Sequence, residues 1–223
     1  MHNKIKIKKQ IILVDDCSTD GTRELIKSKL LNRVDKVIFH NKNRGKGACI
    51  ISSQKYICGD LVIIQDADLE YDPYDLTRII NLFSKDSNID VIYGSRVLNK
   101  KNYSNLTFEK KFRVFANFIL TSINNLFNKQ NLTDAHTCYK IFSKKIFSKL
   151  HLYEKRFAIC SEINTKLSKL NIKIVEVPIK YKGRGYDENK KIGLKDAFDS
   201  LKAIIKYNYF TQSIKKKSVN KII

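Results

Sequence analysis

The segment that decides the fold runs from Lys9 to Gly21 and reads KQIILVDDCSTDG. Four consecutive branched apolar residues, Ile11 to Val14, precede an acidic and hydroxylated cluster. An apolar run bounded in this way predicts a buried parallel strand that ends in a loop. Asp20 and Gly21 then open a helix that we expect over residues 22–31.

The same alternation of strand and helix recurs along the chain. Strands are predicted over residues 34–39, 61–65, 89–93 and 172–181, and helices over residues 47–58, 73–83, 159–170 and 194–207. This spacing favours an α/β fold with a mostly parallel sheet sandwiched by helices. Right-handed crossovers bring the carboxyl ends of the strands to one edge, where ligands bind in such sheets. We expect the loops at Asp15, Asp66 and Gly94 to open there.

The composition describes a globular chain with a strong positive charge. It has 223 residues, 43% of them hydrophobic, and its 43 Lys and Arg against 22 Asp and Glu give a net charge of +21. Collagens, coiled coils and wholly disordered chains are excluded. The charge predicts a surface that attracts the phosphate of a nucleic acid, an anionic lipid or a nucleotide. The alternative is that the Lys-, Ile- and Asn-rich composition reflects genomic base bias.

Cysteine usage and hydropathy favour a cytoplasmic protein. The five cysteines include no C-x-x-C pair, and no His lies at zinc-ligand spacing, so neither a disulfide framework nor a zinc site is predicted. A reducing compartment fits this pattern. No signal peptide is predicted, because Asp15 and Asp16 interrupt the first apolar run. No run approaches the roughly 20 apolar residues that span a bilayer, so we expect any membrane contact to be peripheral.

Residues 100–156 carry 12 Lys and Arg against 3 Asp and Glu. Within this basic segment, apolar residues recur at three- and four-residue intervals and predict an amphipathic helix. These residues are Phe112, Phe115, Ala116, Ile119, Ile123, Leu126 and Phe127. We expect this face to pack on the sheet as part of the core, which is the commoner arrangement. The alternative is a helix that lies in a membrane interface.

Two pairs of carboxylates are predicted at the ligand-binding edge. Asp66 and Asp68, in the stretch QDAD, follow four apolar residues and offer hard oxygen ligands to Mg²⁺ or Mn²⁺. Such an ion could hold a diphosphate and neutralise a leaving nucleotide, although paired aspartates also cap loops. Asp15 and Asp16 form the second pair, and like charges that converge need a cation or hydrogen-bond donors.

Taken in order, several segments resemble the family 2 glycosyltransferases of the GT-A fold, in the subgroup of dolichol- and polyprenyl-phosphate mannose or glucose synthases. The resemblance rests on VDDCSTDGT (14–22), NRGKGA (43–48), QDADLEYDP (65–73), VIYGSR (91–96), LTDAHTCYKIF (132–142), ICSEI (159–163) and VPIKYKGRGYDENKKIG (177–193). NRGKGA is weak by itself, since a glycine-bearing loop before a helix lacks the Walker spacing. The ordered set is far more specific than any one motif.

The resemblance implies a donor site for a nucleotide-diphosphate sugar of the UDP-glucose or GDP-mannose type. The residues that it assigns to nucleotide binding are Asp15, Asp16, Gly45, Lys46 and Asp66. Asp66 and Asp68 would hold the Mg²⁺ or Mn²⁺ ion together with the diphosphate. No nucleic acid is expected as a partner.

The resemblance also implies an acceptor site, for polyprenyl phosphate or a glycan. Arg96, Asp134 and Glu162 would serve catalysis there. A basic loop that closes over phosphates would contain Arg184, Lys190 and Lys191. The transfer would proceed with inversion, and a lipid phosphate needs no strong base because it is already anionic at pH 7. Asp134 would act as a base if the acceptor were a hydroxyl.

The expected organisation is a single domain over residues 1–211, with a nucleotide-binding part at about 10–99, an acceptor part at about 100–211 and a basic tail at 212–223. The family's first strand and helix, with a Pro-x-Tyr-Asn-Glu signature, have no counterpart in the ten residues before Ile11. That strand is central in the family fold, so its loss would leave unpaired strand edges. We therefore expect an N-terminally truncated form of the fold.

Other function classes remain open from the sequence alone. A nucleotidyl- or phosphotransferase would also use paired carboxylates and a basic loop. An inactive glycosyltransferase fragment fits the absent first strand and helix. A basic nucleic-acid-binding domain fits the charge, but its aromatic residues are not interleaved with cations in a recognisable module. The expected location is the cytoplasm or the cytoplasmic face of a membrane.

Overall fold

Among the residues that the structure describes, six strands form two hydrogen-bonded sheets, one of two strands and one of four. A computed structural model of the chain describes residues 7–103, 107–183 and 193–210. The first ladder pairs β1 (Ile12–Asp15) with β2 (Lys36–Phe39) in parallel. The second contains, in spatial order, β3 (Leu61–Ile63), β5 (Lys140–Ser143), β4 (Val91–Ser95) and β6 (Ile174–Pro178).

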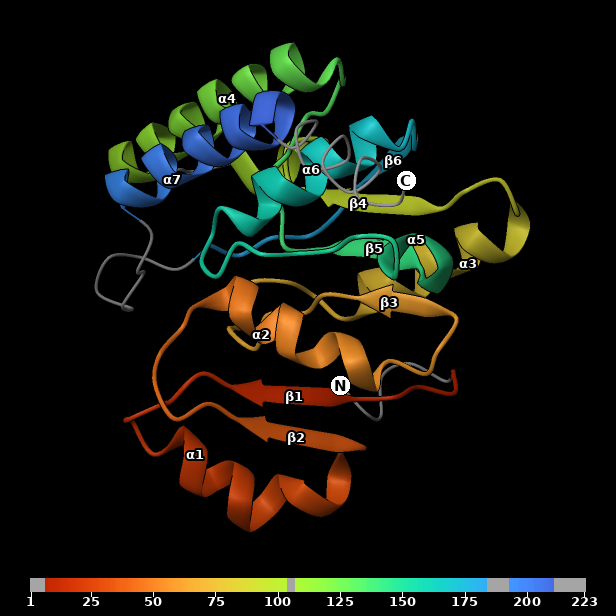
Figure 1. Ribbon diagram of the computed structural model, residues 1–223, viewed down its shortest axis with the longest axis vertical. Helices are drawn as coiled ribbons and strands as arrows, with labels where there is room; N and C mark the ends of the chain where they lie inside the picture. The colour runs from red at the N-terminus through yellow and green to blue at the C-terminus, as the bar shows by residue number, and fades with distance from the viewer. Residues whose placement is uncertain (1–6, 104–106, 184–192, 211–223) are drawn as a thin grey trace, which may run out of the picture.

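Strand direction confirms the predicted fold class. β4 and β6 are parallel, and β5 runs antiparallel to both β3 and β4, so β3, β4 and β6 share one direction. The chain is therefore a mixed α/β protein with a mostly parallel sheet flanked by helices (Figure 1). The sequence predicts the other five strands, whereas β5 was not expected.

The two ladders are not joined to each other in the described part of the chain. Figure 1 shows β1 between β2 and β3, yet β1 pairs with β2 and β3 pairs with β5, with no hydrogen-bonded register between β1 and β3. One edge of β1 thus faces one edge of β3, and no backbone pairing joins the two strands.

The helices connect and cover these strands. Before β4 they are α1 (Thr22–Leu25), continued by η1 (Ile26–Leu30) and η2 (Leu31–Arg33), then α2 (Lys46–Ser53), η3 (Gln54–Tyr56) and α3 (Tyr74–Lys85). Beyond β4 they are η4 (Lys100–Tyr103), α4 (Phe108–Asn128), α5 (Lys144–Phe147), α6 (Ile159–Lys169), α7 (Leu194–Ile205) and η6 (Lys206–Phe210). These bounds agree with the predicted helices within a few residues.

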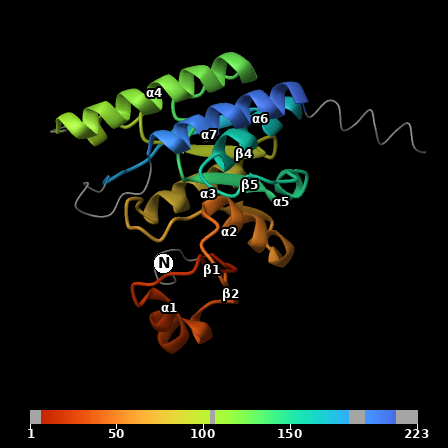
Figure 2. The same cartoon turned by 60° about the vertical axis from the view of Figure 1, so that its left-hand side comes forward.

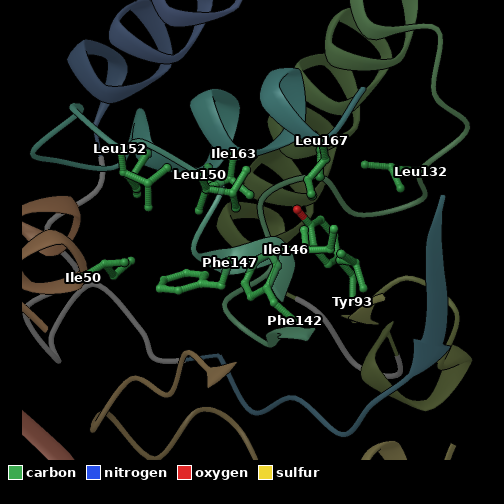
Figure 3. Close-up of a cluster of buried hydrophobic side chains, with 14 residues drawn as sticks. Ile50, Tyr93, Leu132, Phe142, Ile146, Phe147, Leu150, Leu152, Ile163 and Leu167 are labelled. Atoms are coloured by element: carbon green, nitrogen blue, oxygen red, sulfur yellow. The ribbon is translucent and has the colours of Figure 1, made fainter. Parts of the chain in front are cut away.

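Strand β4 explains why the sheet is covered on both faces. Its residues alternate between two apolar clusters, because successive side chains of a strand point to opposite faces. Val91 and Tyr93 pack with Phe142 in the cluster shown in Figure 3, which also contains side chains of α6. Ile92 packs in a second cluster, with side chains of α3. All five residues of β4 are buried.

Helix α4 does not pack as the sequence predicts. Phe112, Phe115, Ile119 and Leu126 were expected in the core, but all four are exposed. The inward face of α4 instead carries polar side chains, which make hydrogen bonds within the protein. Figures 1 and 2 both show α4 beside α7 in the outermost layer, above α6. In the described part of the chain, no helix combines the length and apolar character needed to cross a bilayer.

Candidate active site

A cavity of about 1630 Å³ runs along β1 and β3 and reaches the carboxyl ends of β1, β3 and β4. It extends between the facing edges of β1 and β3, whose residues line it. The predicted site residues that the cavity brings together are Asp16, Lys46, Asp66, Asp68 and Arg96. These residues come from four separate segments of the sequence, so the fold assembles most of the predicted donor site.

Asp16 and Asp15 have different surroundings although they are adjacent. Asp16 lines the cavity, and its carboxylate accepts hydrogen bonds from the backbone N–H groups of Gly45 (2.6 Å) and Arg44 (3.0 Å). Asp15 is buried and accepts hydrogen bonds from Arg23 Nε at 2.7 Å and from the Ser18 N–H at 3.2 Å. Asp15 thus fixes the loop, while Asp16 ties that loop to the glycine-bearing turn before α2.

His40, at the end of β2, is a partner of Asp16 that the sequence analysis missed. Its Nδ1 lies 2.6 Å from Asp16 Oδ1, and its Nε2 lies 2.9 Å from the Ser52 hydroxyl. Burial alone would raise the pKa of Asp16, but the hydrogen bonds from His40 and from two backbone N–H groups hold it below the ordinary value. Asp16 is therefore a carboxylate that can accept further hydrogen bonds from a ligand.

Lys46 and Asp66 make an ion pair inside the cavity. Lys46 begins α2 and Asp66 follows β3, and the Lys46 Nζ donates to Asp66 Oδ2 at 2.7 Å. Asp68 lies two residues further on, and its Oδ1 accepts the Glu70 N–H at 3.1 Å. The loop therefore presents a cation and two carboxylates to one space.

Two glycines allow the start of α2 to pack against residues 154–156. A Cβ atom at Gly47 would overlap the carbonyl oxygen of Glu154, and one at Gly45 would lie 2.8 Å from the carbonyl oxygen of Lys155. Gly45 also has φ of +87°, a conformation that favours glycine. Close backbone contact explains why glycine occupies both positions.

Glu162 supports this loop and does not line the cavity. Its buried carboxylate accepts the N–H groups of Tyr153 (3.0 Å) and Glu154 (2.8 Å) and receives Lys166 Nζ at 2.6 Å. The carboxylate thus fixes the backbone that contacts Gly47. In this structure Glu162 positions the backbone of residues 153–154, whereas the resemblance assigns Glu162 to the acceptor site.

Arg96 and Asp134 form a bidentate ion pair at the end of β4. Arg96 Nε and Nη2 donate to the two oxygens of Asp134, both at 2.7 Å. Asp134 is fully buried behind Arg96, and its backbone N–H donates to Glu176 at 3.0 Å. Burial alone would raise the pKa of Asp134, but the adjacent guanidinium of Arg96 holds it below its usual range. Asp134 therefore orients Arg96, whose guanidinium lines the cavity and lies 5.2 Å from the centre of the Tyr181 ring.

Asp66 and Asp68 fit a hard divalent ion by their chemistry, because both are carboxylates that line the cavity. A second set of possible ligands, Asp16, His40 and Cys49, has ligand atoms within 4.8 Å of one another. That set fits a metal poorly, since both His40 nitrogens already have protein partners. Burial, with the nearby Asp16 charge, raises the pKa of Cys49 to about 12, so its sulfur stays a thiol.

The remaining predicted site residues belong to the basic loop that follows residue 183. Arg184, Lys190 and Lys191 lie outside the described residues. The segment just before them does line the cavity, through Tyr181, Lys182 and Gly183. His136, in the LTDAH stretch, also lines it. The aromatic and basic pattern around residue 181 is the signal that would have marked this wall.

Comparisons with known proteins identify the family and the fold. The model of the family described as "Glycosyl transferase family 2" matches residues 3–151. Dolichol-phosphate mannosyltransferase of Pyrococcus furiosus is 30% identical over 102 residues, which are 46% of this chain and 28% of that protein. UDP-N-acetylglucosamine–dolichyl-phosphate N-acetylglucosaminyltransferase of Methanococcus voltae is 34% identical over 192 residues, 76% of this chain and 73% of that protein. The chain thus spans about a quarter of the first relative and about three quarters of the second.

Solved structures show the same fold at low sequence identity. Glucosyl-3-phosphoglycerate synthase of Mycobacterium tuberculosis, in complex with Mn²⁺, UDP and phosphoglyceric acid, is similar with a TM-score of 0.65 at 14% identity, over 90% of this chain and 68% of that one. Mannosyl-3-phosphoglycerate synthase of Rubrobacter xylanophilus gives a TM-score of 0.64 at 16% identity, over 94% and 64%. The fold is GT-A, and the chain belongs to glycosyl transferase family 2.

Proposed function

We propose that this chain transfers a sugar from a nucleotide-diphosphate sugar, of the UDP-glucose or GDP-mannose type, to a polyprenyl phosphate with inversion. The observation that carries the proposal is the single cavity lined by Asp16, Lys46, Asp66, Asp68 and Arg96. It combines acceptors for a base, cations for phosphates and carboxylates for a metal. Residues 10–99 would form the donor part and residues 100–211 the acceptor part.

On the donor side, Asp16 would accept hydrogen bonds from the nucleotide base, since its carboxylate is ionised and faces the cavity. The Lys46 ammonium group would contact the diphosphate. Asp66 and Asp68 would hold Mg²⁺ or Mn²⁺, which supplies charge neutralisation of the leaving nucleotide diphosphate when bound. The Mn²⁺ and UDP in the similar M. tuberculosis structure support this assignment.

On the acceptor side, Arg96 would bind the phosphate of the lipid, because its guanidinium faces the cavity and is held in place by Asp134. A phosphate oxygen of the acceptor would form a bond to the anomeric carbon while the bond to the nucleotide diphosphate breaks. The attacking oxygen already carries negative charge, so no residue has to remove a proton. Arg184, Lys190 and Lys191 would close over the phosphates.

The names of the relatives favour a lipid phosphate as the acceptor. The two relatives described above are named for dolichol phosphate or dolichyl phosphate, whereas the structural neighbours described above are named for phosphoglycerate. The relatives have about twice the sequence identity of the neighbours. A peripheral position on the cytoplasmic face of a membrane suits this acceptor, because that leaflet presents anionic lipid to a chain of net charge +21.

Calorimetric titration of the purified chain with UDP-glucose and GDP-mannose, with Mn²⁺ or with a chelator, tests the donor site. We expect heat of binding for one donor with Mn²⁺ and a loss of at least tenfold in affinity with the chelator. Asp68→Asn should reproduce that loss. Asp86→Asn is the matched control, since Asp86 is exposed, caps the Asn88 N–H and lies away from the cavity.

A transfer assay then separates acceptors and reaction classes. The chain is mixed with the donor that binds and with either polyprenyl monophosphate in detergent or 3-phosphoglycerate. A glycosylated polyprenyl phosphate of inverted anomeric configuration, detected by mass spectrometry and NMR, is the expected product. Release of sugar 1-phosphate, with the nucleotidyl group transferred to the acceptor, would identify a nucleotidyltransferase. Absence of donor binding by the folded chain would contradict the proposal.

A further inference from the structure

Helix α4 has its polar and apolar faces reversed for a helix on a protein surface. Its exposed stripe is apolar, with Phe118 63% exposed and Leu126 77% exposed. The members of the stripe share one face, since they are separated by three, four or seven residues. Its members are Phe112, Phe115, Phe118, Ile119 and Leu126.

The inward face of α4 is held by hydrogen bonds between polar side chains. Asn124 is fully buried and accepts from Asn128 at 2.9 Å and from Asn164 of α6 at 3.2 Å. Asn117 donates to Asp134 at 3.2 Å, and Thr121 accepts the Ala135 N–H at 3.3 Å. The helix is thus fixed in a rotation that turns its phenylalanines outward, at a cost in exposed apolar area.

Helix α7 extends this surface. α4 and α7 lie side by side in both views (Figures 1 and 2), and Phe127 contacts Tyr209 edge to face with ring centres 6.4 Å apart. Phe198, Ile205 and Tyr209 are exposed on α7 and η6 at helical spacing. We define the α4–α7 face as these three residues together with the exposed stripe of α4.

The exposed charges near the α4–α7 face are positive, whereas the two aspartates of α7, Asp196 and Asp199, are only partly exposed. Lys111 on α4 and Lys195 and Lys202 on α7 are exposed. The sequence contains no Asp or Glu from residue 110 to residue 133, and Asp196 on α7 is engaged in capping the Gly193 N–H. Aromatic residues with lysines beside them suit the boundary between headgroups and acyl chains of an anionic bilayer.

We propose that the α4–α7 face docks on the surface of an anionic lipid bilayer, with the axes of both helices along that surface. The occupant is lipid, since exposed aromatic residues beside exposed lysines match the boundary of an anionic bilayer in both hydrophobicity and charge. Phe112 belongs to the face and also lines the active-site cavity, as do Arg113 and Asn117 of the same helix. Docking would therefore bring the cavity to the headgroup layer. The benefit of placing the cavity near lipid headgroups rests on the proposed function, whereas the docking itself does not.

Co-sedimentation with vesicles tests the docking. The full chain is mixed with vesicles of phosphatidylcholine alone or of phosphatidylcholine with phosphatidylglycerol. We expect binding to the anionic vesicles and at least tenfold weaker partition for Phe115→Ser combined with Phe118→Ser. Leu25→Ser combined with Leu31→Ser is the matched control, because both leucines are about half exposed. They belong to α1 and to its continuation η2, and α1 lies at the opposite end of the molecule from α4 in Figure 1. This control should bind like the original chain.

Charge is tested by Lys195→Gln combined with Lys202→Gln, which should weaken binding to anionic vesicles and lower its dependence on salt. Unchanged vesicle binding by the phenylalanine variant would overturn the proposal, as would a dimer that the same variant dissociates. Circular dichroism shows whether each variant is folded. Donor titration distinguishes the two proposals. Vesicle binding without donor binding would support the docking proposal and contradict the proposed function. Donor binding without vesicle binding would support the proposed function and contradict the docking proposal.

Discussion

The ammonium nitrogen of Lys46 lies 2.7 Å from Oδ2 of Asp66, inside the cavity that carries the proposed donor site. The first residue of α2 thereby reaches a carboxylate that follows β3, although no ladder joins the two sheets in the described residues. Lys46 also occupies one oxygen of a carboxylate proposed as a metal ligand. A lysine and a divalent ion would therefore compete for Asp66 until a diphosphate arrives to accept the lysine.

Replacement of Lys46 by Met should strengthen metal binding and weaken donor binding. Removal of the competing cation is worth about 1 to 2 kcal/mol, so we expect roughly tenfold tighter binding of Mn²⁺ in the absence of nucleotide. Donor affinity should fall by a similar factor, because the diphosphate loses a cation. Titration of Mn²⁺ followed by electron paramagnetic resonance measures the first effect. Lys55→Met is the control, since Lys55 is exposed, and equal Mn²⁺ affinity in both variants would contradict the expectation.

Replacement of Gly47 by Ala should displace the start of α2. The added Cβ would overlap the Glu154 carbonyl oxygen, which belongs to backbone and cannot rotate away. We expect a loss of about 2 kcal/mol in the free energy of unfolding and weaker donor binding. Urea denaturation and calorimetry measure the two effects. Gly59→Ala should change neither, because its Cβ would meet only the Leu61 carbonyl oxygen at 3.6 Å.

Replacement of Asp134 by Asn should destabilise the protein strongly. Asp134 is fully buried, and its loss as a charge leaves the Arg96 guanidinium with an uncompensated charge. Removal of one partner of a buried ion pair costs about 3 to 5 kcal/mol. Asp72→Asn should cost less than about 1 kcal/mol, because the Asp72–Lys180 pair is long, 3.7 Å, and exposed at the lysine. Similar urea midpoints for the two variants would show that the Arg96–Asp134 pair is not a structural anchor.

His136 should make the stability depend on pH below neutrality. Burial, reinforced by the positive charge of Lys140, lowers the pKa of His136 to about 4 in the folded protein, against 6.5 for the free side chain. The unfolded chain therefore binds more protons between pH 6.5 and pH 4, so stability falls as the pH falls through that range. We expect about 2 kcal/mol less stability at pH 5 than at pH 7. In His136→Asn, urea denaturation at the two values should show a smaller difference.

The apolar runs made most of the fold predictable. Val34 to Phe39 and Ile89 to Tyr93 both consist largely of branched or aromatic residues, and both contain strands of the structure. The missed strand, β5, has only four residues and begins with Lys140. Lys140 is nonetheless buried, with its ammonium group donating to the Ala135 carbonyl oxygen and lying over the Tyr93 ring. A pattern of charge and hydropathy does not identify such a lysine as interior.

The direction in which side chains point was less predictable than the elements that carry them. Periodicity correctly gave α4 an apolar stripe but not its orientation, which depends on asparagines that bond to α6 and to the loop at Asp134. Asp15 and Asp16 likewise could not be distinguished, because alternation along a strand turns one inward and its neighbour away. Arg23 binds Asp15, and residues 40–45 bind Asp16. Arg23 and His40 lie outside the motifs that the sequence analysis used, and NRGKGA does not by itself reveal that its backbone N–H groups bind Asp16.

The gap between the two ladders affects how the molecule opens. Asp16 belongs to the two-stranded sheet, whereas Asp66 and Arg96 follow strands of the four-stranded one. Since no strand pairing in the described residues links these sheets, the smaller unit can open locally while the larger core remains closed. A donor that contacts both Asp16 and Asp66 would then hold the two sheets together, and part of its binding free energy would be used to keep them in contact. Donor affinity and the protection of β1 amides against hydrogen exchange would rise and fall together.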